Sequence, residues 1–545
     1  MQLKSAQELA HKQTSLTKLE VLLLNICELV VDQNEHFKKE IQSLKNVINQ
    51  LKGEQGTPRI RKQTKGKSND HSSENNRKNK NRKKPRHKTG SKKGKVKPHQ
   101  TVTLTINPSD LPLDSVCNGV KKTLIQDINV RANNTLFARQ QYYSKLENKY
   151  YLAPLPSGYE GEYGPNIKSW SNVLYSPSEM TLENITGLFN TAGVRVSKST
   201  VHGFVITAGT DMADEKIAIA KAGFKSTPYQ HLDDTGGREK GKNCYVNVVG
   251  NELFSAYFTL HHKDRLSIIK MLSLDDVKCA LNPLAFELMK TMRISEDVMM
   301  SLQAHISPNH YSQLEIEKIL ETVFGGQKQT QQRKLILEAA AISAYRESPY
   351  AISQLIVDDA PQFKLITEAL GLCWIHEGRH YKKLNPIFKN HKVMTEDFID
   401  QFWGYYETLL DYKEKPTEES ARKLNAEFKR LFSTKTGYEN LDKQISATLN
   451  KITPLLLVLK YPNIPIHNNL AELMARRQAR ARDIHLHTMS EEGTQAKDTL
   501  ATITGTAKKL SVNTFQYFYD RITRKFEMTS LAELIARRSI NFNSE

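Results

Sequence analysis

The sequence predicts an α/β core with helical insertions, preceded by an N-terminal coiled coil and a small β-rich module. The core is indicated first by a short strand within 229–238 that ends at an acidic pair, followed by two alternating apolar runs at 243–249 and 254–262. Three strands joined by short polar turns form an antiparallel meander. Two later apolar runs suit strands buried on both faces of a sheet, with a short helix between them. These segments are 354–359, 361–370 and 371–376.

Residues 1–56 predict one long helix with a heptad repeat. Six successive d positions of the heptad are apolar, and one a position is Asn34. The d residues are Leu16, Leu23, Val30, Phe37, Leu44 and Leu51. Such a seam favours pairing with another copy of the chain, and a buried Asn can fix register and strand number. A helix packed on its own protein has the same pattern and stays an alternative.

Residues 57–100 predict a flexible basic linker. From Arg59 to Lys97 there are 17 Lys and Arg against two acidic residues, a net charge of +15 out of +19 for the 545-residue chain. Apolar residues are nearly absent, so the segment cannot bury enough surface to fold. So concentrated a charge indicates contacts with nucleic-acid phosphates and makes a merely solvated linker the weaker interpretation. Lys83 and Lys84 are among the residues expected to make these contacts.

Residues 101–160 predict the small β-rich module, because short alternating apolar runs recur there. The five cysteines of the chain are scattered without a Cys-x-x-Cys pair, and Cys117 is the only one in this module. We therefore expect neither a structural zinc site nor a disulfide framework. The chain has no apolar run near 18 residues, and its N-terminus lacks a signal-peptide core. These features predict a reduced, cytoplasmic protein with no membrane contact.

Residues 161–227 predict a helical region that resembles a helix-turn-helix. A helix, a turn at Ala192-Gly193-Val194 and a second helix capped by Ser197 follow each other within about 25 residues. Lys198, with Ser199 and His202, would then contact DNA. An ordinary helical hairpin has the same sequence pattern and stays an alternative.

The region 228–530 carries carboxylates at three points of the predicted core. Asp233 and Asp358 each close a predicted strand, and Glu472 lies near the start of a late helix. Helical insertions are expected near 273–350 and 385–460. Three basic residues follow Glu472 on its helix, where they either bind phosphate or end a solvated helix: Arg476, Arg477 and Arg480. Residues 531–545 are expected to form a C-terminal tail.

The order of these motifs resembles that of the DDE transposases of bacterial insertion sequences, in particular the large transposase of the insertion-sequence-sixty-six family. Asp233-Asp234-Thr235 matches the first motif of that family, and Asp358 matches its second aspartate. Cys373-x-x-His376-x-x-Arg379 and Asn468-Asn469-x-x-Glu472 match two further signatures. The resemblance extends from about residue 160 to the end of the chain.

The resemblance implies a ribonuclease-H-like core, a mixed five-stranded sheet with helices on both faces. It implies that Asp233, Asp358 and Glu472 hold Mg²⁺, or Mn²⁺, for DNA strand cleavage and strand transfer. His376 and Arg379 would contact the scissile phosphate, although a structural histidine is an equal alternative. The implied partners are the double-stranded DNA of transposon ends and target, with further copies of the chain, in a bacterial cytoplasm at the nucleoid.

Two other functions share most of these features. A non-catalytic, multimeric DNA-binding protein needs the linker and the helix-turn-helix but not the carboxylates. A structure-specific nuclease needs the same carboxylates but performs no strand transfer. The predicted coiled coil and basic linker favour assembly on paired DNA ends over simple cleavage.

Overall fold

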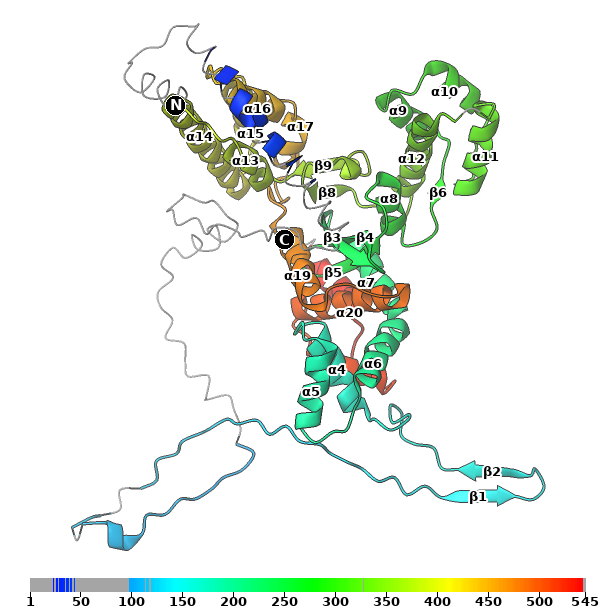
Figure 1. Ribbon diagram of the computed structural model, residues 1–545, viewed down its shortest axis with the longest axis vertical. Coiled ribbons are helices and arrows are strands. Elements are labelled where there is room, and N and C mark those ends of the chain that lie inside the picture. Colours follow the sequence, from blue (N-terminus) through cyan, green and yellow to red (C-terminus); the bar gives the residue numbers. More distant parts are fainter. Residues whose placement is uncertain are drawn as a thin grey trace.

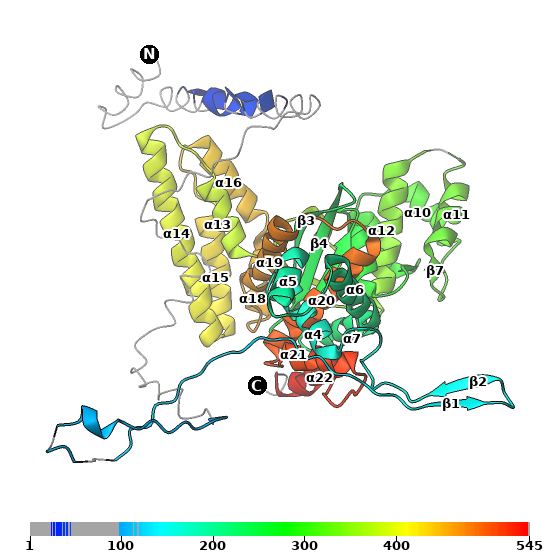
Figure 2. The ribbon, with the colours of Figure 1, turned by 60° about the horizontal axis from the view of Figure 1, so that its bottom comes forward.

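The computed structural model describes residues 98–542 except 113, 117, 118 and 327, together with helical positions between 23 and 44. A sheet lies at the centre of the molecule, with one helical lobe on each side of it and a bundle of helices below (Figure 1). A long arm carries a hairpin well away from this body (Figures 1 and 2).

The central sheet is mixed and five-stranded, with the order β5-β4-β3-β8-β9. Its first three strands form the predicted antiparallel meander, and β8 and β9 continue from β3 in parallel. The strands are β3 Tyr229–Glu239, β4 Lys242–Gly250, β5 Ser255–Leu260, β8 Gln354–Val357 and β9 Ala369–Leu372. The α/β class and the mixed sheet are therefore confirmed.

Three local expectations for this sheet were wrong. The first strand does not end at the acidic pair, because Gly236 and Gly237 pair with β4 and β3 runs on to Glu239. The helix expected over 361–370 is only the 3-10 turn Pro361–Phe363. The strand expected to reach His376 ends at Leu372, because a helix, α13 (Trp374–Lys382), begins there and buries the Trp374 ring.

Helices cover both faces of the sheet. On one face, Leu232, Val249 and Ala256 join the large core that includes α7 (Ala213–Phe224) and α8 (Arg265–Ser273). On the other face, α19 (Asn469–His485) and α20 (Glu491–Lys509) pack on β3, β4 and β5. Since successive residues of a strand point to opposite faces, Val248 and Val249 enter different cores.

Helix α20 also closes the edge of the sheet. The backbone N–H groups of Ser255, Tyr257 and Thr259 on β5 point away from β4 and donate to side chains of α20. The acceptors are Thr506, Thr502 and Asp498, one helical turn apart. A strand edge left open is a template for aggregation, and these three hydrogen bonds remove that template.

Both predicted insertions are helical and form the two lobes (Figure 2). The first contains α9 Pro283–Thr291, α10 Glu296–Gln303, α11 Gln313–Val323 and α12 Thr330–Arg346, with short strands β6 Lys278–Cys279 and β7 Tyr311–Ser312. The second contains α14 Lys389–Glu414, α15 Glu418–Leu431, α16 Glu439–Leu449, α17 Ile452–Leu455 and α18 Leu457–Lys460. The buried ring of Trp374 packs against aromatic rings of the second lobe, including Phe402 and Phe428.

The predicted helix-turn-helix is a pair of helices, α5 (Leu182–Thr191) and α6 (Lys198–Asp211), packed with α4 (Pro165–Tyr175) around a small core of their own. Ser197 caps α6 as expected, since its side chain accepts from Thr200 N–H. The segment expected as a C-terminal tail contains a helix, α22 (Leu531–Phe542), which follows α21 (Thr514–Ile522). It packs on α7 because Leu531 and Ile535 are fully buried.

The small β-rich module expected at 101–160 is not present as a packed unit. Within the described part of this segment there is one 3-10 turn, Pro108–Asp110, and one hairpin of β1 Gln141–Ser144 with β2 Lys149–Leu152. The alternating apolar side chains stay exposed, Leu104 by 89% and Ile128 by 82%, because no second layer of described residues lies against them. The rest of the segment is an extended arm.

The described positions of the N-terminal heptad segment are all helical. Leu23, Val30, Phe37 and Leu44 are exposed by 51–57%, so their seam is open to a partner. Leu16, Leu51, Cys117 and the basic linker with Lys83 and Lys84 lie outside the described residues. No helix in the described part of the chain has the length and apolar character that crossing a membrane requires.

Candidate active site

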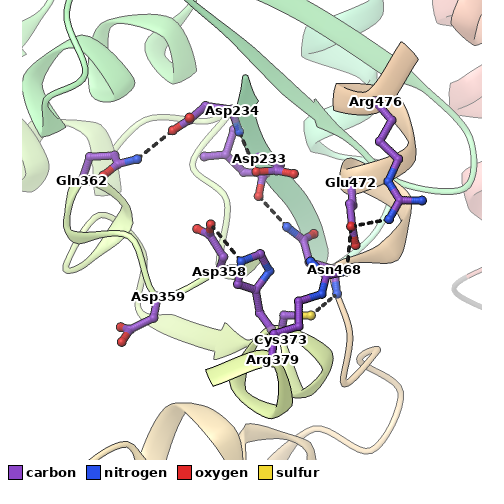
Figure 3. Close-up of polar contacts among 12 residues, drawn as sticks. Asp233, Asp234, Asp358, Asp359, Gln362, Cys373, Arg379, Asn468, Glu472 and Arg476 are labelled. Carbon is purple, nitrogen blue, oxygen red and sulfur yellow. Dashed lines mark hydrogen bonds and ion pairs between the residues drawn. The ribbon is translucent and has the colours of Figure 1, made fainter. Parts of the chain in front are cut away.

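The sheet register brings Asp233 and Asp358 level with each other. In the parallel pair of β3 and β8, His231 lies opposite Ile356, and the pairing ends there. Two residues further along the chain are Asp233, still on β3, and Asp358, directly after the end of β8. Neighbouring strands are about 4.8 Å apart, so the two carboxylates enter the same space where the strands part (Figure 3). The site therefore lies at the carboxyl end of β8.

The two aspartates repel each other in a partly buried environment. Burial, and then the charge of Asp358, raise the pKa of Asp233 to about 7. Burial also raises the pKa of Asp358, although His376 lies 3.9 Å from its Oδ2. Oδ1 of Asp358 is buried and has no hydrogen-bond partner among the described residues. The pair is thus deficient in positive charge.

The adjacent carboxylates, Asp234 and Asp359, have partners of their own. Asp234 accepts hydrogen bonds from Lys263 and Gln362, both at 2.7 Å. Asp359 forms ion pairs with Lys364 and Lys451, both at 2.8 Å. Burial opposes ionisation of Asp359, but these two lysines hold its pKa below the ordinary range. Lysines therefore neutralise one member of each acidic pair and leave Asp233 and Asp358 without such partners.

Glu472 is positioned by Asn468, one turn before it on α19. The Asn468 side-chain amide donates to the carbonyl oxygen of Leu232 at 2.8 Å, next to Asp233 in the chain. Its Oδ1 then accepts from Nδ1 of His231 at 3.0 Å. Burial lowers the pKa of His231 to about 3, so this ring is neutral with its proton on Nδ1. Asn468 thereby fixes the start of α19 against β3.

The carboxylate of Glu472 is engaged by two arginines. Its Oε1 accepts from Arg379 at 2.8 Å and from Arg476 at 2.6 Å (Figure 3). Burial favours the protonated form, but these two guanidinium groups hold the pKa of Glu472 below its ordinary range. The charge of Glu472 still contributes to raising the pKa of Asp233, so the third carboxylate lies within electrostatic reach of the first.

The Cys373-x-x-His376-x-x-Arg379 signature lies on the first turns of α13 and not on a strand. Cys373 is buried, and its Sγ accepts from the backbone N–H of Asn468 at 3.2 Å. His376 and Arg379 follow at helical spacing and face Asp358 and Glu472. The spacing thus joins α13 to the start of α19 and aims two basic side chains at the carboxylates.

The other predicted DNA contacts differ in their availability. Arg476 and Arg480 on α19, and Lys198 at the start of α6, are exposed. Arg477 is not available, because its guanidinium donates to the carbonyl oxygen of Ser176 and forms an ion pair with Glu179. Arg477 therefore joins α19 to the segment after α4, and its guanidinium is not free for the DNA contact that the sequence predicted.

Sequence reasoning missed His231, Lys263 and Lys451 as parts of the site. Lys263 and Lys451 reach the acidic pairs from segments far away in the chain, so no local pattern could identify them. The role of Asn468 had a signal, since it lies at i−4 to Glu472 in the Asn-Asn-x-x-Glu motif.

A divalent cation fits the Asp233–Asp358 pair in chemical terms. Within the described residues, no three His, Cys, Asp or Glu side chains are grouped closely enough to hold a metal ion. Oδ1 of Asp358 nevertheless has no hydrogen-bond partner among the described residues, and the pKa of Asp233 is raised. Both features are expected of carboxylates that bind a cation. Mg²⁺ prefers such oxygens and keeps several waters, so few protein ligands suffice. Glu472 would join them only after leaving its arginines.

The chain is similar to a protein of Sinorhizobium fredii described as "Uncharacterized protein y4jO". The two are 30% identical over 320 residues, which is 58% of this chain and 99% of the Sinorhizobium protein. No model of a protein family matches the chain.

Proposed function

This chain belongs to the same family as y4jO of Sinorhizobium fredii, and we propose that it is a DDE-type DNA transposase. The observation that carries the proposal is that Asp233 and Asp358 lie together just beyond the point where β3 and β8 cease to pair, with Glu472 beside them. Such a set is suited to phosphodiester chemistry with Mg²⁺ or Mn²⁺.

The proposal includes a ribonuclease-H-like catalytic core. It is supported by the strand order, in which an antiparallel meander is continued by two parallel strands, and by helices on both faces. The carboxylates lie on the first strand, after the fourth strand and on a late helix. Because one fold serves many reactions, the site and not the sheet carries the functional argument.

Each residue of the site then has a chemical task. When bound, two divalent cations can activate the attacking water and stabilise the leaving 3′-oxygen. Asp233 and Asp358 would hold these cations with their carboxylates. Asn468 orients Glu472 from the other side by its hydrogen bond to Leu232. Lys263 and Lys451 keep Asp234 and Asp359 out of the coordination shell by pairing with them.

Arg379 and Arg476 exchange partners in this proposal. Guanidinium groups bind phosphate as well as carboxylate, because both present oxygens that match the guanidinium fork. DNA entering the site offers phosphate oxygens to the two arginines and releases Glu472 toward Asp233. His376, 3.9 Å from Asp358, is placed on the same side of the site as Arg379.

The remaining parts of the chain serve DNA capture and assembly. The exposed start of α6, with Lys198, would read DNA, and the basic linker with Lys83 and Lys84 would add binding that does not depend on sequence. The exposed heptad seam joins copies of the chain, as handling two transposon ends requires. The proposed location is the bacterial cytoplasm, at the nucleoid.

The test separates chemistry from binding with two variants. Asp233→Asn keeps the size of the side chain and removes its charge, so it should abolish Mg²⁺-dependent nicking of DNA that carries the flanks of the gene, while filter binding persists. Neutralising the lysines and arginines of 77–97 should do the reverse: binding weakens, its salt dependence flattens, and nicking at saturating DNA persists. If Asp233→Asn nicks at the parental rate, the proposal is wrong.

A non-catalytic DNA-binding protein is the second candidate. It is favoured by the engagement of Glu472 with two arginines and by the absence of a three-residue metal group within the described residues. The parental protein would then bind DNA without nicking it at any Mg²⁺ or Mn²⁺ concentration. A structure-specific nuclease would nick DNA but would not join a 3′-hydroxyl end to a second duplex.

A further inference from the structure

A groove of about 720 Å³ lies beyond the carboxylates, between the end of the β3–β4 hairpin and the last turns of α19. Gly236, Arg238 and Tyr245 line it from the hairpin, and Arg482 and His487 line it from the helix and the residues after it. The two elements that carry Asp233 and Glu472 thus also form the walls of this groove.

The charge of the groove is positive. Arg238, Lys240 and Lys242 are exposed at the hairpin end, opposite Arg482 and His487. Asp483 lines the groove, and the buried Glu239 and Asp498 lie within electrostatic reach of its lining residue Cys244. Glu239 is buried and accepts a hydrogen bond from Thr494, so it does not face the groove as a free charge. Asp483 is 76% exposed and 4.0 Å from Arg482.

The shape suits a backbone of linked phosphates. Gly236 presents no side chain, so an incoming strand can approach the β3 backbone closely. Arg482 donates one N–H to the carbonyl oxygen of Gly236, which fixes its guanidinium at the groove wall and leaves other donors free for a phosphate. Half-buried Tyr245 lines the groove, and the Lys263 ammonium lies 5.8 Å from the centroid of its ring, which adds a positive charge beside the groove.

We infer that this groove holds the sugar–phosphate backbone of one DNA strand on its way to the carboxylates. This inference rests on the proposed function. The distance from the carboxylate to the arginine is similar along the two walls of the groove. Asp233 to Arg238 is five residues of strand, about 16 Å, and Glu472 to Arg482 is ten residues of helix, about 15 Å. At about 3.4 Å of helix axis per nucleotide, a duplex lying along the groove places there phosphates roughly four to five nucleotides from the reacting bond.

The test uses the full chain and a 30-base-pair duplex with a single-stranded 3′ tail as the probe. Hydrogen exchange should show DNA-dependent protection of peptides covering 236–245 and 480–487, and Arg238→Gln/Arg482→Gln should lose it while protection of α6 persists. In binding measured by anisotropy across a KCl series, the double variant should lose about two from the salt slope. Asp483→Asn should bind more tightly, since it removes an opposing charge.

The controls keep the result interpretable. Within the described part of the chain the Arg238 side chain forms no hydrogen bond or ion pair, so Arg238→Gln alone tests the groove if Arg482→Gln disturbs the fold. Arg430→Gln, 81% exposed on the second lobe, is the matched control and should bind like the parent. Unprotected 236–245 in a saturated complex, or an unchanged slope for the double variant, overturns the inference. A parent that binds in the groove but never nicks DNA would refute the proposed function and leave the groove assignment standing.

Discussion

Replacing Asp233 by Asn should stabilise the protein at neutral pH in the absence of divalent cations. The pKa of Asp233 is raised from 3.8 to about 7 by burial and by the charge of Asp358. The folded carboxyl therefore keeps its proton at pH values where the unfolded carboxyl has lost it. Stability is lost as pH rises between these two values, because folding takes up a proton there. Asn carries no such penalty.

The size of the effect follows from the shift. One pKa unit corresponds to about 1.36 kcal/mol, so ionised Asp233 destabilises the folded state by about 4 kcal/mol above pH 8. At pH 5.5 the same reasoning gives about 2 kcal/mol, and well below pH 3.8 the difference vanishes. The advantage of the variant should thus grow by about 2 kcal/mol between pH 5.5 and pH 8, or roughly 2 °C in Tm for a folded chain of this size.

The assay is thermal unfolding of both proteins in EDTA and in a Mg²⁺ series, at several pH values. Mg²⁺ should raise the Tm of the parent and leave Asp233→Asn nearly unchanged, because a ligand stabilises only the state that binds it. Asp234→Asn is the matched control. Its carboxylate is paired with Lys263, so this variant should be destabilised by about 1 kcal/mol. Parallel pH profiles for parent and Asp233→Asn would refute the electrostatic reasoning.

Three further predictions concern the edge of the sheet, assembly and DNA reading. Thr502→Val keeps the side-chain shape but leaves the buried N–H of Tyr257 without an acceptor, so urea unfolding should show a loss of about 1–3 kcal/mol; equal midpoints would exclude this role. Deleting 16–51 should reduce the oligomeric mass measured by light scattering, and an unchanged mass would refute pairing through the heptad seam. Lys198→Ala with His202→Ala should reduce the preference for one DNA sequence over another more than total binding, whereas a uniform loss would point to phosphate contacts alone.

The parts of the fold that the sequence predicted are those set by local pattern. Alternation along β4 and β5, and continuous apolar runs at β8 and β9, follow from which faces are buried. The positions of Asp233 and Asp358 relative to their strands follow from the same runs. Local pattern could not predict that these two aspartates lie close together. Their proximity depends on the parallel register of strands more than 120 residues apart in the chain, with His231 opposite Ile356.

The errors have a common physical origin. The arm at 101–160 has strand-like alternation, but alternation predicts a strand only where a partner and a second layer exist. The segment at 531–542 is short and close to the C-terminus, yet Leu531 and Ile535 find a complementary surface on α7.

The contact of α20 with the edge of the sheet had a signal in the sequence. Its acceptors lie at i, i+4 and i+8, and Asp and Thr at that spacing share one face of a helix.

The balance of charge in the site explains why carboxylates and arginines are placed so close together. Three carboxylates repel DNA, and two guanidinium groups on Glu472 compensate for only part of that charge in this structure. Under the proposed function, cations and phosphate act on different parts of the site. The cations neutralise Asp233 and Asp358, and the phosphate draws the arginines from Glu472. Neither ligand alone completes the set. Binding of DNA and of Mg²⁺ should therefore be cooperative, because the phosphate that draws the arginines away frees Glu472 as a third carboxylate for the cations.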